Sequence, residues 1–374
     1  MLRCHCYNGT ILRTERGMNM HMADALLAPA VAATMYAASA VTVGASVKTL
    51  KKDETAAKLP TMAVASALVF AGQMINYTIP GTGSSGHLCG GMLLSALLGP
   101  QAGFLSMVVI LTIQCLFFAD GGLLALGANC WNMAFYGCFV GYYLLWRPMM
   151  RSRLFGSMGA RAAGRMRIIL ASVLGCVLTL QLGAFSVVLE TSLSGITELP
   201  FAAFVAIMQP IHLAIGLIEG LITSAVLLFV YEARPALLMD VNAGDTAVQG
   251  RCSLRATLAV LTAVVVVVGG GLSLVASANP DGLEWSMFGN AEAGYSTNMG
   301  LDEESYGLTS GAAETFGAIQ EKTAFLPDYA FANSDSAAGT TVSGLVGSAM
   351  VAGAAILVCV AGGFFRKKKI AEKA

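Results

Sequence analysis

Residues 203–231 read AFVAIMQPIHLAIGLIEGLITSAVLLFVY, and this stretch decides the fold class. It exceeds the roughly 20 apolar residues that a helix needs to cross a bilayer, so it predicts a transmembrane helix. Its imidazole and its carboxylate, His212 and Glu219, are seven residues apart and therefore share a helical face. Ionisable groups inside a membrane often mark a functional pathway. A hydrogen bond that only fixes packing is also compatible with this spacing.

The composition of the whole chain agrees with a membrane location. Of 374 residues, 56% are hydrophobic and 12% are charged, and the mean hydropathy is +0.69. Soluble domains carry about 25% charged residues, so the chain falls in the membrane class. Its 22 basic and 22 acidic residues cancel, and we therefore expect no nucleic-acid partner.

The apolar stretches predict an all-α integral membrane protein with about nine transmembrane helices. The third candidate span is short and rich in glycine, which favours a position inside the bundle rather than against lipid. The candidate spans are residues 24–48, 60–79, 87–99, 101–119, 122–146, 166–190, 203–231, 254–277 and 341–365.

Basic residues in the loops predict the orientation of these spans. They cluster after odd-numbered spans, and the positive-inside rule then places those loops and the C-terminus in the cytoplasm of a bacterial or archaeal cell. The residues before Asp24 and the loop 278–340 are expected outside. The basic clusters are Lys48, Lys51, Lys52 and Lys58; Arg147, Arg151, Arg153, Arg161, Arg165 and Arg167; Arg234, Arg251 and Arg255; and Arg366, Lys367, Lys368 and Lys369.

The loop 278–340 is strongly acidic, with Lys322 as its single basic residue. It is rich in alanine, glycine and serine and has little to bury, so we expect a loosely ordered segment. Its charge could raise the local concentration of cations, or the loop could be no more than a solvated linker.

Two of the four histidines fall on the same side in this topology. His21 precedes the first span, and His87 follows the second span at the end of the glycine-rich stretch IPGTGSSGH (79–87). Imidazole is a ligand that suits nickel, copper and zinc. The alternative is a pair of surface histidines that bind nothing.

A start of translation at Met20 would turn the first of these histidines into a chelate. The free amine of Met20, the backbone nitrogen of His21 and the imidazole of His21 can close two fused rings on one metal, and His87 can supply a fourth nitrogen. Four nitrogens in a plane favour Ni(II) or Cu(II) over the tetrahedral sites of zinc.

Other polar and small residues near the predicted site or the first span have more than one reading. Asp24 is close in sequence to His21 and could orient it. Asp120 lies at a predicted span end and could be a helix cap or part of an outer gate. Ala33 and Ala37 have the spacing that lets helices approach closely, either to dock a partner subunit or to pack within the chain.

The sequence contains no Gly-x-x-x-x-Gly-Lys-Ser/Thr motif, and no glycine in it is followed by lysine. The chain is therefore not its own P-loop ATPase. If its transport activity is driven by ATP, another subunit must supply the energy. We expect no enzymatic activity and no catalytic residue in this chain.

Long motifs resemble the CbiM/NikM metal-binding membrane components of energy-coupling factor transporters. The match begins with MHMADALLAP at 20–29. It continues through Gln73–Asn76, 79–90, Phe117–Asn132, 181–185 and 212–220. Candidates for residues that orient the ligands or line the path of the metal are Asp24, Asn76, Ser84, Ser85, Asp120, His212 and Glu219.

The remainder resembles the companion subunit CbiN/NikN, through PDGLE at 280–284 and TAFLPDY at 323–329. The resemblance implies a fused protein with a seven-helix substrate-binding bundle and a two-helix companion unit. The family begins at the Met-His pair, so the resemblance implies that residues 1–19 are a wrongly assigned extension. The other expected parts are the metal-binding domain 20–235, a cytoplasmic linker 236–253 and the companion unit 254–374.

The resemblance also implies a function. The chain would capture Ni²⁺ or Co²⁺ as substrate through Met20, His21 and His87, with no catalytic cofactor. Its partners would be a CbiQ/NikQ-like membrane coupling subunit and a CbiO/NikO-like ATPase. Nickel is favoured, and cobalt import for cobalamin synthesis is the alternative. An ion-coupled secondary transporter and a membrane metallohydrolase have less support, because the chain lacks an evident repeat and a His-Glu-x-x-His motif.

Overall fold

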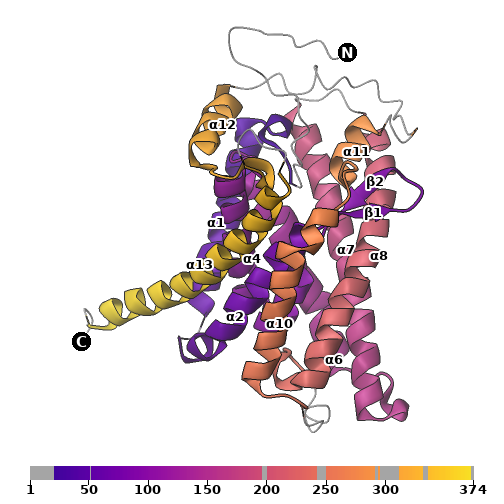
Figure 1. The fold of residues 1–374 in the computed structure, drawn as a ribbon, viewed down its shortest axis with the longest axis vertical. Helices are drawn as coiled ribbons and strands as arrows, with labels where there is room; N and C mark the ends of the chain where they lie inside the picture. The colour runs from indigo at the N-terminus through magenta and orange to yellow at the C-terminus, as the bar shows by residue number, and fades with distance from the viewer. Residues whose placement is uncertain are drawn as a thin grey trace.

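Helices make up nearly all of the computed structural model (Figure 1). It describes residues 21–50, 52–195, 200–241, 250–290, 294, 311–331 and 336–371. The main helices are α1 (Pro29–Thr49), α2 (Lys52–Gln73), α3 (Gly91–Leu98), α4 (Pro100–Phe118), α5 (Leu126–Asn129), the π-helix η2 (Cys130–Trp146), α6 (Arg147–Arg151), α7 (Ala160–Ser194), α8 (Phe201–Ala233), α10 (Leu254–Gly270), α11 (Gly282–Phe288), α12 (Gly311–Thr323) and α13 (Ala338–Ala371). Short 3-10 turns are η1 (Asp24–Leu26), η3 (Gly156–Met158), η4 (Pro235–Leu237), η5 (Leu272–Val275) and η6 (Pro327–Tyr329).

The predicted all-α membrane fold is confirmed, but nine long spans are not. In the described part of the chain, five helices are long and apolar enough to cross a membrane, namely α1, α4, α7, α8 and α13, and α10 is a shorter apolar helix. The expected third span shrinks to the eight residues of α3, all of them buried, as its glycines suggested. The expected fifth span is divided into α5 and η2.

The second expected span also differs from the prediction. Helix α2 ends at Gln73, and the chain then forms the antiparallel hairpin β1 (Tyr77–Ile79) and β2 (Ser84–Gly86), with Tyr77 opposite Gly86. The glycine-rich tip supplies the turn: Gly81 and Gly83 both have positive φ. The hairpin therefore takes residues that hydropathy alone assigned to a membrane helix.

Two groups of helices pack side by side. Helices α7 and α8 form one long pair, and η2 lies against α7. Helices α10 and α13 of the C-terminal part both pack on α2. The approach of α10 to α13 is so close that a side-chain carbon at Gly344 would overlap the carbonyl of Gly269. Small residues permit such contacts between membrane helices.

The loop 278–340 is not uniformly irregular, contrary to the expectation. It contains α11, α12 and η6, which lie with the β1–β2 hairpin at one end of the molecule (Figure 1). Met287 and Ala313, one from each helix, are buried in an apolar cluster with Leu26 and Phe204. These contacts supply the apolar burial that the acidic composition seemed to lack.

Candidate functional site

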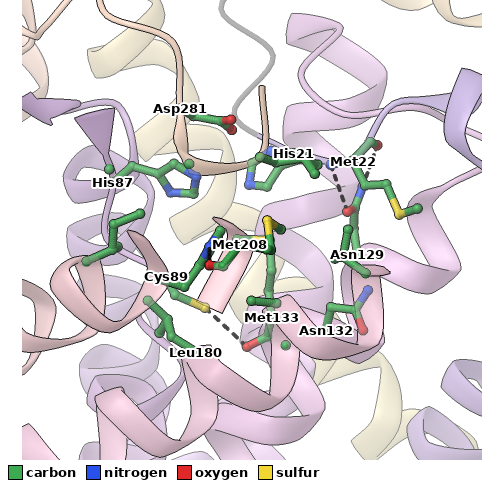
Figure 2. A pocket seen from close by; sticks show the side chains of 18 of the residues that line it. His21, Met22, His87, Cys89, Asn129, Asn132, Met133, Leu180, Met208 and Asp281 are labelled. Carbon is green, nitrogen blue, oxygen red and sulfur yellow. Dashed lines mark hydrogen bonds between the residues drawn. The ribbon is translucent and has the colours of Figure 1, made fainter. Parts of the chain in front are cut away.

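A cavity of about 110 Å³ lies at this end of the molecule, below the segments that carry His21 and His87 (Figure 2). Its walls come from the chain before α1, the loop after β2, the helices η2, α7 and α8, and the start of α11. The lining residues are His21, Met22, Gly86, His87, Cys89, Asn129, Asn132, Met133, Gly137, Thr179, Leu180, Gly183, Ala184, Val187, Met208, His212, Ile215, Asp281, Gly282 and Leu283.

The two histidines from the sequence prediction face one another across the top of this cavity (Figure 2). Their ring centroids are 5.5 Å apart, and the rings are inclined by 67°. His21 is only 5% exposed and His87 is half-buried. Burial disfavours the charged form of His87, and the nearby His21 adds to this effect, so the pKa of His87 is lowered. A neutral imidazole with a free lone pair is the form that binds a metal.

Asp120 holds the imidazole of His21 in place. His21 Nδ1 lies 2.8 Å from Asp120 Oδ1, and the hydroxyl of Tyr329 donates to Asp120 Oδ2 at 2.6 Å. Burial alone would raise the pKa of Asp120, but the charge of His21 and these two hydrogen bonds outweigh it, and the pKa is lowered. His21 Nε2 is buried and has no hydrogen-bond partner among the described residues.

The backbone beside His21 is fixed as firmly as its side chain. The N–H of Met22 donates to Asn129 Oδ1, and Asn129 Nδ2 donates to the carbonyl of Met22, both at 3.1 Å. Gly121 has positive φ, and a side-chain carbon there would lie 2.7 Å from His21 Cβ. Asp24 accepts from the N–H of Ala125 at 3.0 Å, so it fastens the segment rather than the imidazole.

Asn129 and Tyr329 were not among the site residues predicted from sequence. Both lie inside quoted motifs, Phe117–Asn132 and 323–329, but no spacing rule relates either of them to His21. Asp120 was predicted as a cap or a gate; its side chain instead bridges His21 and Tyr329.

Glu219 fixes the loop that follows His87. Its two carboxylate oxygens accept from the N–H groups of Cys89 at 2.9 Å and Gly90 at 3.0 Å. His212 does not bond to Glu219; its Nδ1 donates to the carbonyl of Met208 at 2.8 Å. Because Nδ1 then carries the proton, Nε2 of His212 has the lone pair. His212 lines the cavity, whereas Glu219 lies behind its wall.

Asn76, Ser84 and Ser85 contact the C-terminal part of the chain. The N–H of Ser85 donates to the carbonyl of Pro280, and the N–H of Ser277 donates to the carbonyl of Asn76. The Ser84 hydroxyl bonds within its own strand, with a longer contact of 3.4 Å to Pro280. These bonds place the segment 277–280, and with it Asp281, over the cavity.

Asp281 begins α11 as its N-cap, because its Oδ1 accepts from the N–H of Glu284 at 2.8 Å. It lines the cavity together with His21 and His87 (Figure 2). Burial raises the pKa of Asp281, while the neighbouring His87 and His21 act in the opposite direction and moderate the rise.

Among the described residues, no three His, Cys, Asp or Glu side chains form a group that could hold a metal ion. Met20 lies outside the described residues. The described residues thus bring two imidazoles, those of His21 and His87, face to face at the cavity.

Ala33 and Ala37 lie on an exposed part of α1. Only 17% of the apolar stretch of this helix is buried inside the molecule, compared with 67% for α4. Within the described chain, the small-residue face of α1 is therefore not used for internal packing.

Two family models match separate parts of the chain. Residues 21–237 match a family described as the cobalt uptake substrate-specific transmembrane region, CbiM, and residues 255–362 match the PDGLE domain. A protein of Archaeoglobus fulgidus, provisionally named a fused nickel transport protein, NikMN, is 35% identical over 89% of this chain and 95% of its own length.

Two further relatives show how the match divides. The fused nickel transport protein NikMN of Rhodobacter capsulatus is 30% identical over 89% of this chain and 95% of its own length. The cobalt transport protein CbiM of Sorangium cellulosum is 31% identical over 59% of this chain and 94% of its own length.

Proposed function

The chain belongs to the CbiM family of cobalt and nickel transport proteins and carries a PDGLE domain. We therefore propose that it captures Ni²⁺ or Co²⁺ at the external face of the cell membrane for ATP-driven import. It is a multi-pass transport component and not an enzyme. The observation that carries the capture site is the pair of imidazoles of buried His21 and half-buried His87, whose rings face one another over a cavity.

The metal is held by a planar set of nitrogens. The set consists of the amine of Met20, the backbone nitrogen and imidazole of His21, and the imidazole of His87; the backbone nitrogen binds as its deprotonated form and releases its proton to water. In such a chelate, Nδ1 of His21 closes the second ring. This is the nitrogen that contacts Asp120 in the structure, so capture by this route includes a turn of the imidazole away from Asp120.

The amine ligand requires that Met20 be the first residue of the mature protein. Purified protein that begins at Met20 is expected to bind Ni²⁺ in calorimetry, with Co²⁺ measured in parallel. A chain that retains residues 1–19 has a peptide bond at Met20 and is expected to bind at least about 10-fold more weakly, because one chelate ring is lost. N-terminal sequencing of the native protein then identifies its first residue.

Equal affinity of the two forms would contradict the amine ligand. A native chain that retains Cys4 to Arg16 would also contradict it. Neither result would remove the two imidazoles from the site.

Nickel is the favoured cargo. Two relatives that match 89% of the chain are named for nickel, and planar four-nitrogen coordination suits Ni(II). The cobalt-named relative of Sorangium cellulosum matches 59% of the chain. Cobalt uptake for cobalamin synthesis by the same mechanism is the second candidate.

The energy for import comes from partner subunits. The sequence has no P-loop, so we propose a cytoplasmic ATPase and a membrane coupling subunit of the energy-coupling factor type. The exposed face of α1 around Ala33 and Ala37 is a candidate docking surface for the coupling subunit.

Uptake of radioactive Ni²⁺ tests whether import depends on the partner subunits. Cells that express the chain with both partner subunits are expected to accumulate the ion, and an ATPase variant without its P-loop lysine should reduce uptake to background. Full uptake by cells that express this chain alone would favour an ion-coupled secondary transporter instead.

A further inference from the structure

Asp281 is a buried carboxylate that the C-terminal part of the chain contributes to the candidate metal site. It is 8% exposed and lines the same cavity as His21 and His87. In Figure 2 it lies above the two imidazoles, on the side of the cavity opposite Met133. A carboxylate in this position costs free energy unless it has a partner of opposite charge or enough hydrogen bonds.

The position of Asp281 is fixed by contacts between the two parts of the chain. The Ser85 hydroxyl donates to the carbonyl of Asn279 at 2.8 Å, and the Ser85 N–H donates to the carbonyl of Pro280 at 2.8 Å. Asn290, which follows α11, donates to the carbonyl of Gly83 at 2.9 Å. The β1–β2 hairpin therefore holds both ends of the segment that carries Asp281.

Helix α8, on the other wall of the cavity, also restricts the position of Asp281. A side-chain carbon at Gly282 would lie 3.0 Å from His212 Cε1 and 2.8 Å from Ile215 Cδ1. The start of α11 thus packs directly on α8. The residue before Gly282 is consequently held at the cavity, and it has little freedom to move into solvent.

One oxygen of Asp281 is committed to the helix cap. The cap uses Oδ1, which accepts from the N–H of Glu284. A cap accepts a hydrogen bond from a backbone N–H, so it is compatible with an ionised carboxylate, and this carboxylate lines the cavity shared with His21 and His87. Asp120 supplies a second buried carboxylate on the His21 side.

We propose that Asp281 and Asp120 are the counter-charges for a divalent cation held between His21 and His87, with one carboxylate supplied by each part of the chain. The proposal rests on the proposed function, because it places the cation at those histidines. The three neutral nitrogens cancel none of the charge of a dication, and the deprotonated backbone nitrogen of His21 cancels one unit, so the bound ion keeps a net positive charge that is costly to bury. Carboxylates close to the ligands offset that charge without taking a coordination position.

Asp281 acts on the bound ion through its charge, and a substitution can remove this charge while it keeps the N-cap of α11. Asparagine is about as good an N-cap as aspartate, so Asp281→Asn keeps α11 and removes the charge. In calorimetry with Ni²⁺ alone, this variant is expected to bind about 10-fold or more weakly, at the lower end of the range for partners that surround metal ligands. Glu284→Gln is the matched control: it removes one carboxylate from the same helix, outside the cavity lining, and should bind as the wild type does.

Hydrogen exchange on the metal-free proteins separates charge from structure. The amides of residues 281–288 should exchange at the same rate in Asp281→Asn and in the wild type. Weaker Ni²⁺ binding with unchanged exchange supports the proposal. Unchanged binding overturns it, and so does weaker binding with faster exchange of α11, since the residue would then act only through the fold. A wild type that binds no Ni²⁺ would instead refute the capture function itself.

Discussion

Replacing His87 by alanine is expected to remove most Ni²⁺ binding, and His21→Ala should do the same. Each change deletes one imidazole of a pair whose ring centroids lie 5.5 Å apart. Loss of a ligand should weaken binding by more than the roughly 10- to 100-fold that follows loss of a group hydrogen-bonded to a ligand. Calorimetry with Ni²⁺ and Co²⁺ measures both variants against the wild type.

His212→Ala is the comparison variant. It removes a third imidazole from the lining of the same cavity, but the side chain is anchored to its own helix through the carbonyl of Met208. Its effect on affinity should stay within about 3-fold, which is less than 1 kcal/mol. A loss as large as that of His87→Ala would place His212 among the ligands, and normal binding by both His21→Ala and His87→Ala would refute the site.

Glu219→Ala is expected to give the largest loss of stability. The buried carboxylate of Glu219 satisfies the N–H groups of Cys89 and Gly90, and its removal leaves both donors without that partner. A buried donor left unpaired costs about 1–3 kcal/mol, so the loss of a partner for two donors should lower the free energy of unfolding by roughly 2–6 kcal/mol. Thermal unfolding of the protein in detergent measures this change.

The same variant should also weaken Ni²⁺ binding, because the loop it releases begins at His87. Glu219→Gln retains an amide oxygen that can accept one of the two hydrogen bonds, and should lose about half as much stability. If Glu219→Ala unfolds at the temperature of the wild type, the carboxylate is not what holds this loop.

Much of the fold could be predicted from hydropathy and charge, but not its irregular parts. The long apolar stretches became α1, α4, α7, α8 and α13. The residues after Gln73 were assigned to a membrane helix because Tyr77 and Ile79 are apolar, yet they form a hairpin. Hydropathy counts apolar residues and does not record the turn geometry that glycines allow.

The candidate site likewise contains residues that could be predicted from the sequence and residues that could not. His21 and His87 could be brought together from sequence, because a topological rule placed both on one side of the membrane. Tyr329 and Asn129 could not, since their roles depend on hydrogen bonds across more than 100 residues of chain. Ser84 and Ser85 are expected near the metal path, and in the structure their hydroxyl groups contact the segment before Asp281.

The hydrogen bonds between Ser85 and the segment 279–280 join two parts of one chain. Docking of the PDGLE segment on the hairpin is therefore an intramolecular event, governed by an effective concentration of the order of millimolar rather than by the abundance of a separate subunit. A handful of hydrogen bonds is enough to hold the segment under that condition. In a fused chain the PDGLE segment that lies over the candidate metal site consequently stays in a one-to-one ratio to that site, however little of the protein the cell makes.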